Sequence, residues 1–261
     1  MTVILFFNII DKGMVSTWGI DFTKVYGLLG FDIEGGRMID FHSHVLPGID
    51  DGSDCVEESL EMLHTAKNQG VSTMLATPHF YAQDVSVDHF LEKRKKAYDT
   101  LKRCMDDSDC PDIRLGAEVC YFRGIGRARE IEKLCIEGTR VIMVELPFRQ
   151  WDEEVLRDVE ELMEKQNVSV MLAQNRKKIW KEVLDLPVIF QVNAEFFDGR
   201  KKRKLIKKLV EENRPVVLGS DCHNTDRRKP NLDMGYSFIR EKIGQNAVDE
   251  IEKVSVEILE K

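Results

Sequence analysis

The chain has 261 residues, 43% of them hydrophobic, and this length allows one large domain or two small ones to bury a core. Its formal net charge of −8 argues against nucleic acid as the main partner, because a phosphate backbone requires clustered lysines and arginines. The six cysteines include no C-x-x-C pair, which indicates reduced thiols in a cytoplasmic protein rather than a disulfide framework.

Residues 1–37 differ from the rest of the chain. Their apolar start is shorter than the roughly 20 residues that a membrane span needs, and it lacks the basic residues and cleavage site of a signal peptide. Glu34-Gly-Gly-Arg37 directly precedes Met38, and codons for this tetrapeptide can spell a ribosome-binding sequence. We therefore expect 1–37 to be an N-terminal extension, with a translated leader as the hypothesis for its origin, and 38–261 to be the functional domain.

From Met38 onward, short apolar runs rich in β-branched residues alternate with longer helical patterns. The predicted strands lie near 38–43, 72–77, 113–118, 140–146, 168–173, 187–193 and 215–219. The predicted helices lie near 54–69, 87–106, 127–137, 152–166, 176–184 and 199–212, and a last helix spans 231–258. Repeated strand–helix units predict an α/β fold with parallel strands, and at this length a closed or nearly closed (β/α)7 barrel fits better than an open sheet.

Imidazole and carboxylate side chains stand at the ends of the predicted strands. His42 and His44 end the first strand two residues apart, so strand alternation places both on one face. The other candidates are Asp51 in the following loop and His79, Glu118, Glu145, Asp221 and His223 at later strand ends. Because the carboxyl ends of barrel strands form one rim, we expect these side chains to converge there. Asp50 is expected to be a turn residue rather than a ligand, and Asn193 a hydrogen-bonding partner of the ligands.

This mixture of donors predicts a multinuclear metal site. Imidazole and carboxylate together suit Mn, Fe or Zn, whereas oxygen donors alone would favour Mg or Ca. Two or more cations can activate a hydroxide and neutralise phosphoryl oxygens during in-line attack, so the pattern indicates phosphoester hydrolysis. The sequence contains no glycine-rich nucleotide loop, which disfavours phosphate transfer from ATP.

Cys222 and Arg228 offer an alternative, because their spacing satisfies the C-x5-R pattern of thiolate phosphatases. Such loops curl backbone amides around the phosphate and lower the thiol pKa. The intervening residues contain no glycine, and Asp221 and Asp226 would oppose a thiolate. The metal site is therefore the favoured interpretation.

Four segments resemble the PHP superfamily, and more narrowly its metal-dependent protein-tyrosine phosphatases of capsular and exopolysaccharide synthesis. They are MIDFHSHVLPGIDDGS (38–53), ATPH (76–79), GAEV (116–119) and SDCHNT (220–225). The resemblance covers residues 38 to about 258. It implies a distorted seven-stranded barrel with three metals, usually Mn, and a phosphotyrosine-bearing tail of a membrane-associated tyrosine autokinase as substrate. Homo-oligomerisation stays open.

The resemblance also implies a role for each matched residue. One metal would be held by His42, His44, Glu118 and Asp221. A second would be held by Asp51, His79 and His223. Glu118 and Glu145 would serve the third, with Glu118 bridging. Arg228 matches an arginine that the family uses on the substrate phosphate, where a guanidinium can bind in bidentate fashion.

The chain departs from the family after the fifth predicted strand, with AQNRKK at 173–178 in place of AHPERY. Gln174 replaces a histidine ligand, and a neutral amide oxygen is a weaker donor, so the third metal should bind loosely. Lys177 replaces a second phosphate-binding arginine, for which Arg176 could substitute. Reduced activity follows as an expectation. The alternatives are a weakly active or inactive regulatory binding partner of the kinase, and a PHP phosphatase for a small phosphoester such as histidinol phosphate.

Overall fold

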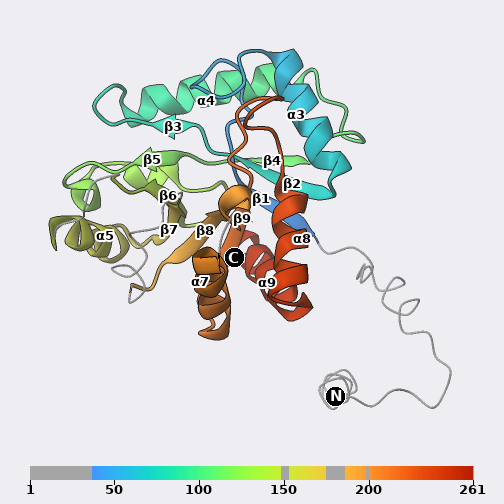
Figure 1. The fold of residues 1–261 in the computed structure, drawn as a ribbon. Helices are drawn as coiled ribbons and strands as arrows, with labels where there is room; N and C mark the ends of the chain where they lie inside the picture. The colour runs from blue at the N-terminus through green and yellow to red at the C-terminus, as the bar shows by residue number, and fades with distance from the viewer. Residues whose placement is uncertain (1–36, 148–152, 175–185, 198–199, 261) are drawn as a thin grey trace, which may run out of the picture. The chain divides into compact units, whose positions relative to one another are not determined.

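A computed structural model describes residues 37–147, 153–174, 186–197 and 200–260 (Figure 1). The expected extension at 1–37, apart from Arg37, and the expected helix at 176–184 lie outside these residues. The strands are β1 (Met38–Ser43), β2 (Val71–Ala76), β3 (His79–Phe80), β4 (Asp112–Leu115), β5 (Glu118–Cys120), β6 (Val141–Glu145), β7 (Ser169–Gln174), β8 (Ile189–Asn193) and β9 (Val216–Gly219). The α-helices are α3 (Val56–Asn68), α4 (Val87–Lys102), α5 (Glu153–Gln166), α7 (Arg200–Glu211), α8 (Leu232–Lys242) and α9 (Gln245–Leu259).

The helix expected at 127–137 is wrong. The 3₁₀ helix η1 (Ile125–Arg127) ends where the expected helix would begin, and the segment itself contains only the short 3₁₀ helix η2 (Ile131–Leu134). Each begins after a residue with a left-handed backbone, Gly124 (φ 79°) and Glu130 (φ 64°). Ile131 and Leu134 are buried three residues apart, and a 3₁₀ turn of three residues places both on one side.

Two further boundaries differ from the prediction. The last helix is divided into α8 and α9 at Gly244, whose φ of 129° is incompatible with helix. The strand expected at 113–118 is divided into β4 and β5 at Gly116, and the short β3 lies beside β5.

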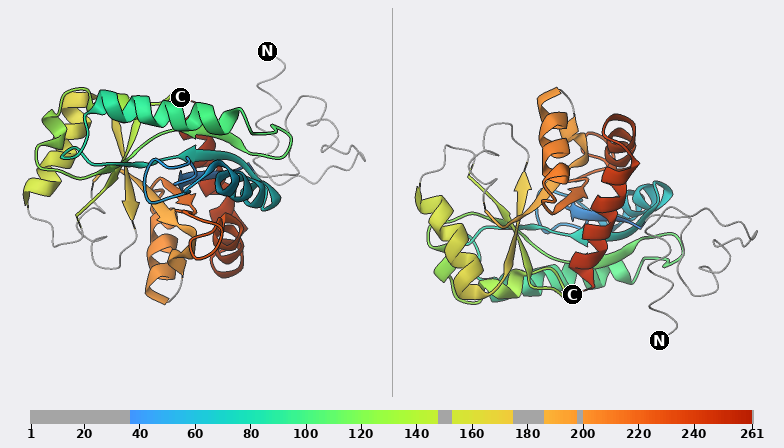
Figure 2. Two further views of the ribbon diagram at one scale, coloured as in Figure 1. Left: turned by 90° about the horizontal axis from the view of Figure 1, so that it is seen from above. Right: turned by 90° about the horizontal axis from the view of Figure 1, so that it is seen from below.

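The strands form two sheets, with orders β1-β2-β4 and β3-β5-β6-β7-β8-β9. Every strand pair in the described part of the chain is parallel, which confirms the predicted α/β fold with parallel strands. Both views in Figure 2 place α4 on one side of the strands and α7 on the opposite side. Among the described residues, no helix combines the length and apolar character needed to cross a membrane.

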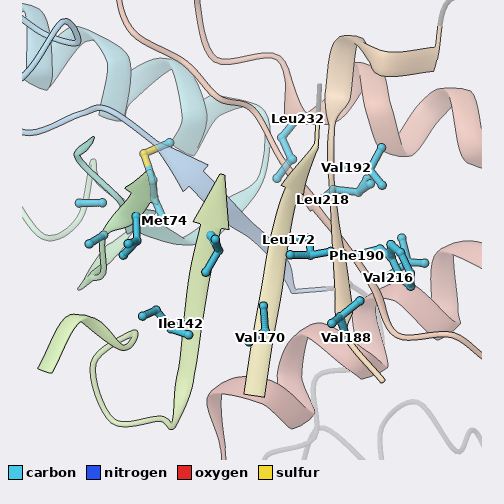
Figure 3. Packing of buried hydrophobic residues seen from close by; sticks show 14 of the residues in the cluster. Met74, Ile142, Val170, Leu172, Val188, Phe190, Val192, Val216, Leu218 and Leu232 are labelled. Atoms are coloured by element: carbon cyan, nitrogen blue, oxygen red, sulfur yellow. The ribbon is translucent and has the colours of Figure 1, made fainter. Parts of the chain in front are cut away.

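Strand alternation sorts the core into two clusters. In β7, Val170 and Leu172 belong to the larger cluster, whose members pack between strands and helices (Figure 3). Met171 and Ala173 belong to the smaller cluster, which the strands share with Ile258 and Leu259 at the end of α9. Both faces of the strands are therefore buried, as continuous apolar runs in parallel strands require.

Candidate metal centre

The candidate centre lies where the strands of the smaller core cluster end. In β6, Val141 and Met143 belong to that cluster, and Glu145 follows at the same two-residue spacing. In β8, Ile189 leads in the same way to Gln191 and Asn193. The face that is apolar at the start of each strand thus becomes polar toward its carboxyl end.

Donor atoms of His42, His44 and Glu118 lie within 4.8 Å of one another at this rim, and Asp221 adjoins the two imidazoles. The Nε2 atom of His42 lies 3.2 Å from His44 Nε2, 3.1 Å from Glu118 Oε2 and 3.4 Å from Asp221 Oδ1. His44 Nε2 lies 3.3 Å from the same Glu118 oxygen and 3.5 Å from the same Asp221 oxygen. Ligands about 2.1 Å from a common cation stand roughly 3.0–3.4 Å apart in octahedral or tetrahedral arrangements. The spacing of the His42, His44 and Glu118 atoms therefore fits one shared cation, with Asp221 Oδ1 beside the two imidazoles.

A second group of donors adjoins the first on its more open side. Asp51 Oδ1 lies 3.3 Å from His79 Nε2 and 3.6 Å from His223 Nε2, and the Asp51 side chain is 65% exposed. The other ring nitrogen of His79, Nδ1, lies 3.1 Å from Glu118 Oε2. Glu145 gathers with His79 and Glu118 in a third group whose donor atoms all lie within 4.8 Å of one another. Glu118 Oε2 is consequently shared by three imidazoles, as a bridging oxygen would be.

Two buried nitrogens support a metal in this centre. His79 Nδ1 lies close to Glu118 Oε2, and His223 Nε2 lies 3.6 Å from Asp51 Oδ1, but neither nitrogen forms a hydrogen bond among the described residues. The pKa of His223 is lowered to about 4, first by burial and then by the neighbouring His44, and its Nδ1 donates to the Asp221 carbonyl at 3.0 Å. Its Nε2 therefore carries a lone pair to which no group donates a hydrogen bond, and a cation can satisfy such a nitrogen.

The charges of the buried groups depend on one another. Burial opposes protonation of His42, but the carboxylates of Glu118 and Asp221 outweigh burial and raise its pKa to about 9. Burial in turn opposes ionisation of those two carboxyls, yet the adjacent imidazoles hold their pKa values below the ordinary range. The pKa of Glu145 is raised, first by burial and then by Glu118. The centre thus requires positive charge next to its carboxylates, which protonated imidazoles or metal cations can supply.

A chain of hydrogen bonds on the side of His42 that faces away from the other donors fixes the orientation of its ring. The Nδ1 atom of His42 donates to Gln191 Oε1 at 2.9 Å, and Gln191 Nε2 donates to Asn193 Oδ1 at 2.9 Å. Asn193 Nδ2 then donates to Asp221 Oδ2 at 2.7 Å, which agrees with the partner role expected of Asn193. The chain of bonds therefore links His42 to Asp221 through Gln191 and Asn193, and leaves His42 Nε2 facing His44 and Glu118.

Asp50 has a larger part than the sequence suggested. It does close a turn, because Oδ1 accepts the amide of Gly52 at 3.0 Å. Its Oδ2 also accepts from His44 Nδ1 at 2.7 Å and from the His79 amide at 3.0 Å. Burial would raise the pKa of Asp50, but the bond with His44 outweighs burial and lowers it to about 2.

Close backbone approach brings β1 against the segment after β9. A Cβ atom on Gly219 would lie 2.5 Å from the Cβ of His42 and 2.9 Å from its amide nitrogen, so only glycine fits. The Asp221 amide donates to the His42 carbonyl at 2.8 Å, and the His44 amide donates to the Cys222 carbonyl at 2.9 Å. Asp221 has a φ of 54°, a left-handed conformation rare for residues other than glycine and worth about 1–3 kcal/mol of strain. Asp221 adopts this conformation where its Oδ1 lies 3.4 Å from His42 Nε2 and 3.5 Å from His44 Nε2.

The residues expected to contact the phosphate are only partly described. Arg228 places Nη2 2.8 Å from Asp221 Oδ2, and its side chain is 40% exposed. Arg176 and Lys177 lie outside the described residues. Gln174 is the last residue of β7 and pairs with Val192 of β8, but its side chain also lies outside the described part.

The structure argues against Cys222 as a nucleophile. Its side chain is fully buried in the larger core cluster, and burial followed by the charge of Asp40 raises the pKa of the thiol above its ordinary range. A reactive cysteine needs partial exposure and a lowered pKa, so the thiolate alternative lacks both requirements.

Sequence reasoning missed Gln191 and Asp40. Asp40 is fully buried, and its Oδ1 accepts the amides of His42 at 3.2 Å and Ser220 at 2.8 Å, so it joins the two ligand-bearing segments. Burial raises the pKa of Asp40 to about 6. Their positions could have indicated this. Asp40 lies two residues before His42, and Gln191 lies two residues before Asn193, so each shares a strand face with a residue already singled out.

Comparisons with known proteins agree with this geometry. The sequence profile of the family described as "Capsular polysaccharide synthesis, CpsB/CapC" matches residues 38–258. Tyrosine-protein phosphatase CpsB of Streptococcus pneumoniae is 26% identical over 237 residues, which cover 82% of this chain and 94% of that protein. Tyrosine-protein phosphatase YwqE of Bacillus subtilis is 25% identical over 205 residues, 73% of this chain and 79% of that protein.

Solved structures show the same fold. One from a study of YwqE from Bacillus subtilis and CpsB from Streptococcus pneumoniae, described as unique metal-dependent tyrosine phosphatases, matches with a TM-score of 0.69 at 21% identity. The match covers 85% of this chain and 94% of that chain. A TatD-family hydrolase from Entamoeba histolytica matches with a TM-score of 0.57 at 9% identity, over 86% of this chain and 98% of that chain.

Proposed function

We propose that this chain, which belongs to the CpsB/CapC family of capsular polysaccharide synthesis, is a metal-dependent phosphatase that hydrolyses phosphotyrosine on a protein. The observation that carries the proposal is the convergence of His42, His44 and Glu118 at mutual distances that fit one cation, with Asp221 Oδ1 3.4 Å and 3.5 Å from the two imidazoles. Asp51, His79 and His223 would hold a second ion, and Glu118 with Glu145 a third, for which Gln174 is a weak additional donor.

The protein's own residues would orient the reacting groups. Bound cations would supply charge stabilisation for the phosphoryl oxygens and a water of lowered pKa. Gln191 and Asp50 hold His42 and His44 by their Nδ1 atoms, so each ring presents Nε2 to the centre. Arg228 is partly exposed next to Asp221, and its guanidinium can turn to bind two phosphate oxygens. Lys177 and Arg176 are the further cations proposed for the phosphate.

Several finer points belong to the same proposal. Mn²⁺ is the proposed metal, in two or three ions, with Fe or Zn as alternatives; the mixed imidazole and carboxylate donors support this choice. An isolated parallel β-bridge joins Ser43, the last residue of β1, to Cys222 in the segment after β9. This bridge supports closure of the strands into a distorted (β/α)7 barrel. Residues 38–261 are proposed as the phosphatase domain, supported by the profile match, whereas a leader origin for 1–37 stays a prediction for mass spectrometry of the native protein.

The proposed physiological substrate is the phosphotyrosine-bearing tail of a membrane-associated tyrosine kinase of capsule or exopolysaccharide synthesis. The names of the relatives and of the family support it. A cytoplasmic location is proposed as well, and the six cysteines, all free, are consistent with a reducing compartment.

Metal analysis combined with turnover tests the function. The purified full chain is expected to retain Mn²⁺ and to dephosphorylate a phosphotyrosine peptide, with activity lost in EDTA and restored by Mn²⁺. Faster turnover of histidinol phosphate would instead favour the small-phosphoester alternative. Binding to a phosphorylated kinase tail without turnover would favour the regulatory partner. Activity that resists EDTA but is lost in Cys222→Ser would refute the metal mechanism.

A further inference from the structure

Two neighbouring segments pass from one sheet to the other just before they reach the metal centre. β2 and β4 pair in the three-stranded sheet, whereas β3 and β5, which follow them after two residues each, pair in the six-stranded sheet. We call residues 77–78 and 116–117 the sheet crossing. His79 and Glu118 come directly after it and are register partners, so the sheet crossing delivers two donors of the centre side by side.

A side chain of helix α4 holds the backbone at the sheet crossing. Arg94 Nη1 donates to the Gly116 carbonyl at 2.5 Å, and the Gly116 amide donates to the Ala76 carbonyl at 2.8 Å. Gly116 is buried, and a Cβ atom there would lie 3.2 Å from a Thr77 methyl and 3.4 Å from Ile136, so its surroundings are closely packed. Because a buried carbonyl that loses its partner is destabilised, Gly116 would shift without Arg94.

The position of Glu118, two residues further along, depends on the same stretch of backbone. Its amide donates to the carbonyls of Thr77 at 3.2 Å and Pro78 at 3.1 Å, across the sheet crossing. Its Oε2 lies between 3.1 and 3.3 Å from a ring nitrogen of each of three imidazoles. Groups that bind one ion must be held to within about 0.5 Å, so a shift of the 116–118 backbone would disturb this arrangement.

Packing alone does not account for an arginine at this position of α4. Arg94 is only 9% exposed, and among the described residues it forms no ion pair and its Nε has no hydrogen-bond partner. Its guanidinium lies 5.6 Å from the centroid of the Phe90 ring, and burial lowers the pKa of Arg94. A buried charge without a carboxylate is costly, and the helix buries apolar Phe90 and Leu101 on the same side. The bond to Gly116 is the contribution that an apolar side chain could not make.

We propose that Arg94 is a positioning residue of the metal centre, because its bond to the Gly116 carbonyl holds Glu118 within reach of the three imidazoles. This inference rests on the proposed function and deepens it, since it assigns to α4 a residue that supports metal binding without donating to a metal. Removal of the guanidinium is expected to weaken Mn²⁺ binding while every donor atom stays in the chain.

Two measurements on the full chain test this role. Arg94→Met keeps an unbranched apolar stem but cannot donate, so calorimetric titration of Mn²⁺ into the metal-free variant should give a Kd about ten-fold above that of the wild type. Amide hydrogen exchange of the metal-free protein, measured by NMR, should be faster at Glu118 in the variant. Arg94→Lys keeps a charged donor without the planar fork, so its Mn²⁺ affinity should lie between those of the wild type and Arg94→Met.

Arg214 offers a matched control, because it makes the same two kinds of contact away from the centre. It donates to the Leu186 carbonyl, and its guanidinium lies 5.2 Å from the centroid of the Phe190 ring. Arg214 and Leu186 precede β9 and β8, whose opposite, carboxyl ends reach the rim. Arg214→Met should lower the melting temperature, as Arg94→Met does, but keep the wild-type Mn²⁺ affinity and the wild-type exchange at Glu118. Melting temperatures verify that each variant is folded.

Three results would overturn the inference: an unchanged Mn²⁺ affinity or Glu118 exchange rate in Arg94→Met, equal changes in Arg214→Met, or an affinity in Arg94→Lys no higher than in Arg94→Met. If Arg94→Met does not fold, Arg94→Lys is compared with the wild type, and an unchanged Mn²⁺ affinity overturns the inference. Failure of the proposed function is a separate result, namely no Mn²⁺ binding by the wild type, and the exchange rates of Glu118 in the metal-free proteins then still decide whether Arg94 positions it.

Discussion

Replacing Gln191 with leucine should weaken metal binding although Gln191 contributes no donor atom to the centre. Gln191 is fully buried between His42 Nδ1 and Asn193 Oδ1, at 2.9 Å from each. Leucine has a similar volume but cannot accept or donate, so His42 loses the bond that fixes its tautomer and Asn193 loses a donor. Each buried group left without a partner costs about 1–3 kcal/mol. Loss of such an orienting bond typically weakens metal affinity by about 10–100-fold.

Isothermal titration of Mn²⁺ into the metal-free full chain measures this effect, and thermal unfolding measures the accompanying loss of stability. Gln191→Glu is the informative second variant, because a carboxylate still accepts from His42 Nδ1; its Mn²⁺ affinity should exceed that of Gln191→Leu. Gln166→Leu is the matched control, since Gln166 ends α5 and bonds the Gly126 carbonyl at 3.2 Å. Wild-type Mn²⁺ affinity in Gln191→Leu, or equal losses in both leucine variants, would refute the reasoning.

Further predictions concern the same centre. Gly219→Ala should lower the free energy of unfolding by about 1–3 kcal/mol, because its Cβ would overlap His42, and the melting temperature should fall accordingly. Gly116→Ala, where the nearest atom is a Thr77 methyl at 3.2 Å, should lower the free energy of unfolding by less. The raised His42 pKa, about 9 against an ordinary 6.5, stabilises the metal-free protein below pH 6.5, and this stabilisation should be lost as pH rises toward 9; an unfolding series at several pH values should show the decline. Gln174→His should raise turnover and Mn²⁺ stoichiometry, and a fall in either would count against a missing third-metal ligand.

The sequence predicted most strands and the residues at their ends because these signals are local. A run such as Val141–Glu145 has the length and branching of a buried strand, and its last residue is a carboxylate whatever surrounds it. His42 and His44 share a face because alternation is a property of the strand itself. The helix expected at 127–137 is wrong because Glu130, inside the segment, has a left-handed backbone that interrupts a helix.

Only the tertiary structure decided how the centre is supported. The bond between His42 and Gln191 joins residues 149 positions apart, and no local pattern predicts it. The same holds for the burial of Cys222, which removes the thiolate alternative, and for Gly219, whose missing side chain makes room for His42. Local sequence thus determines which donor reaches the rim, whereas packing between distant strands determines how each donor is oriented and which thiol is accessible. Orientation and burial depend on neighbours in space, and only the folded chain brings those neighbours together.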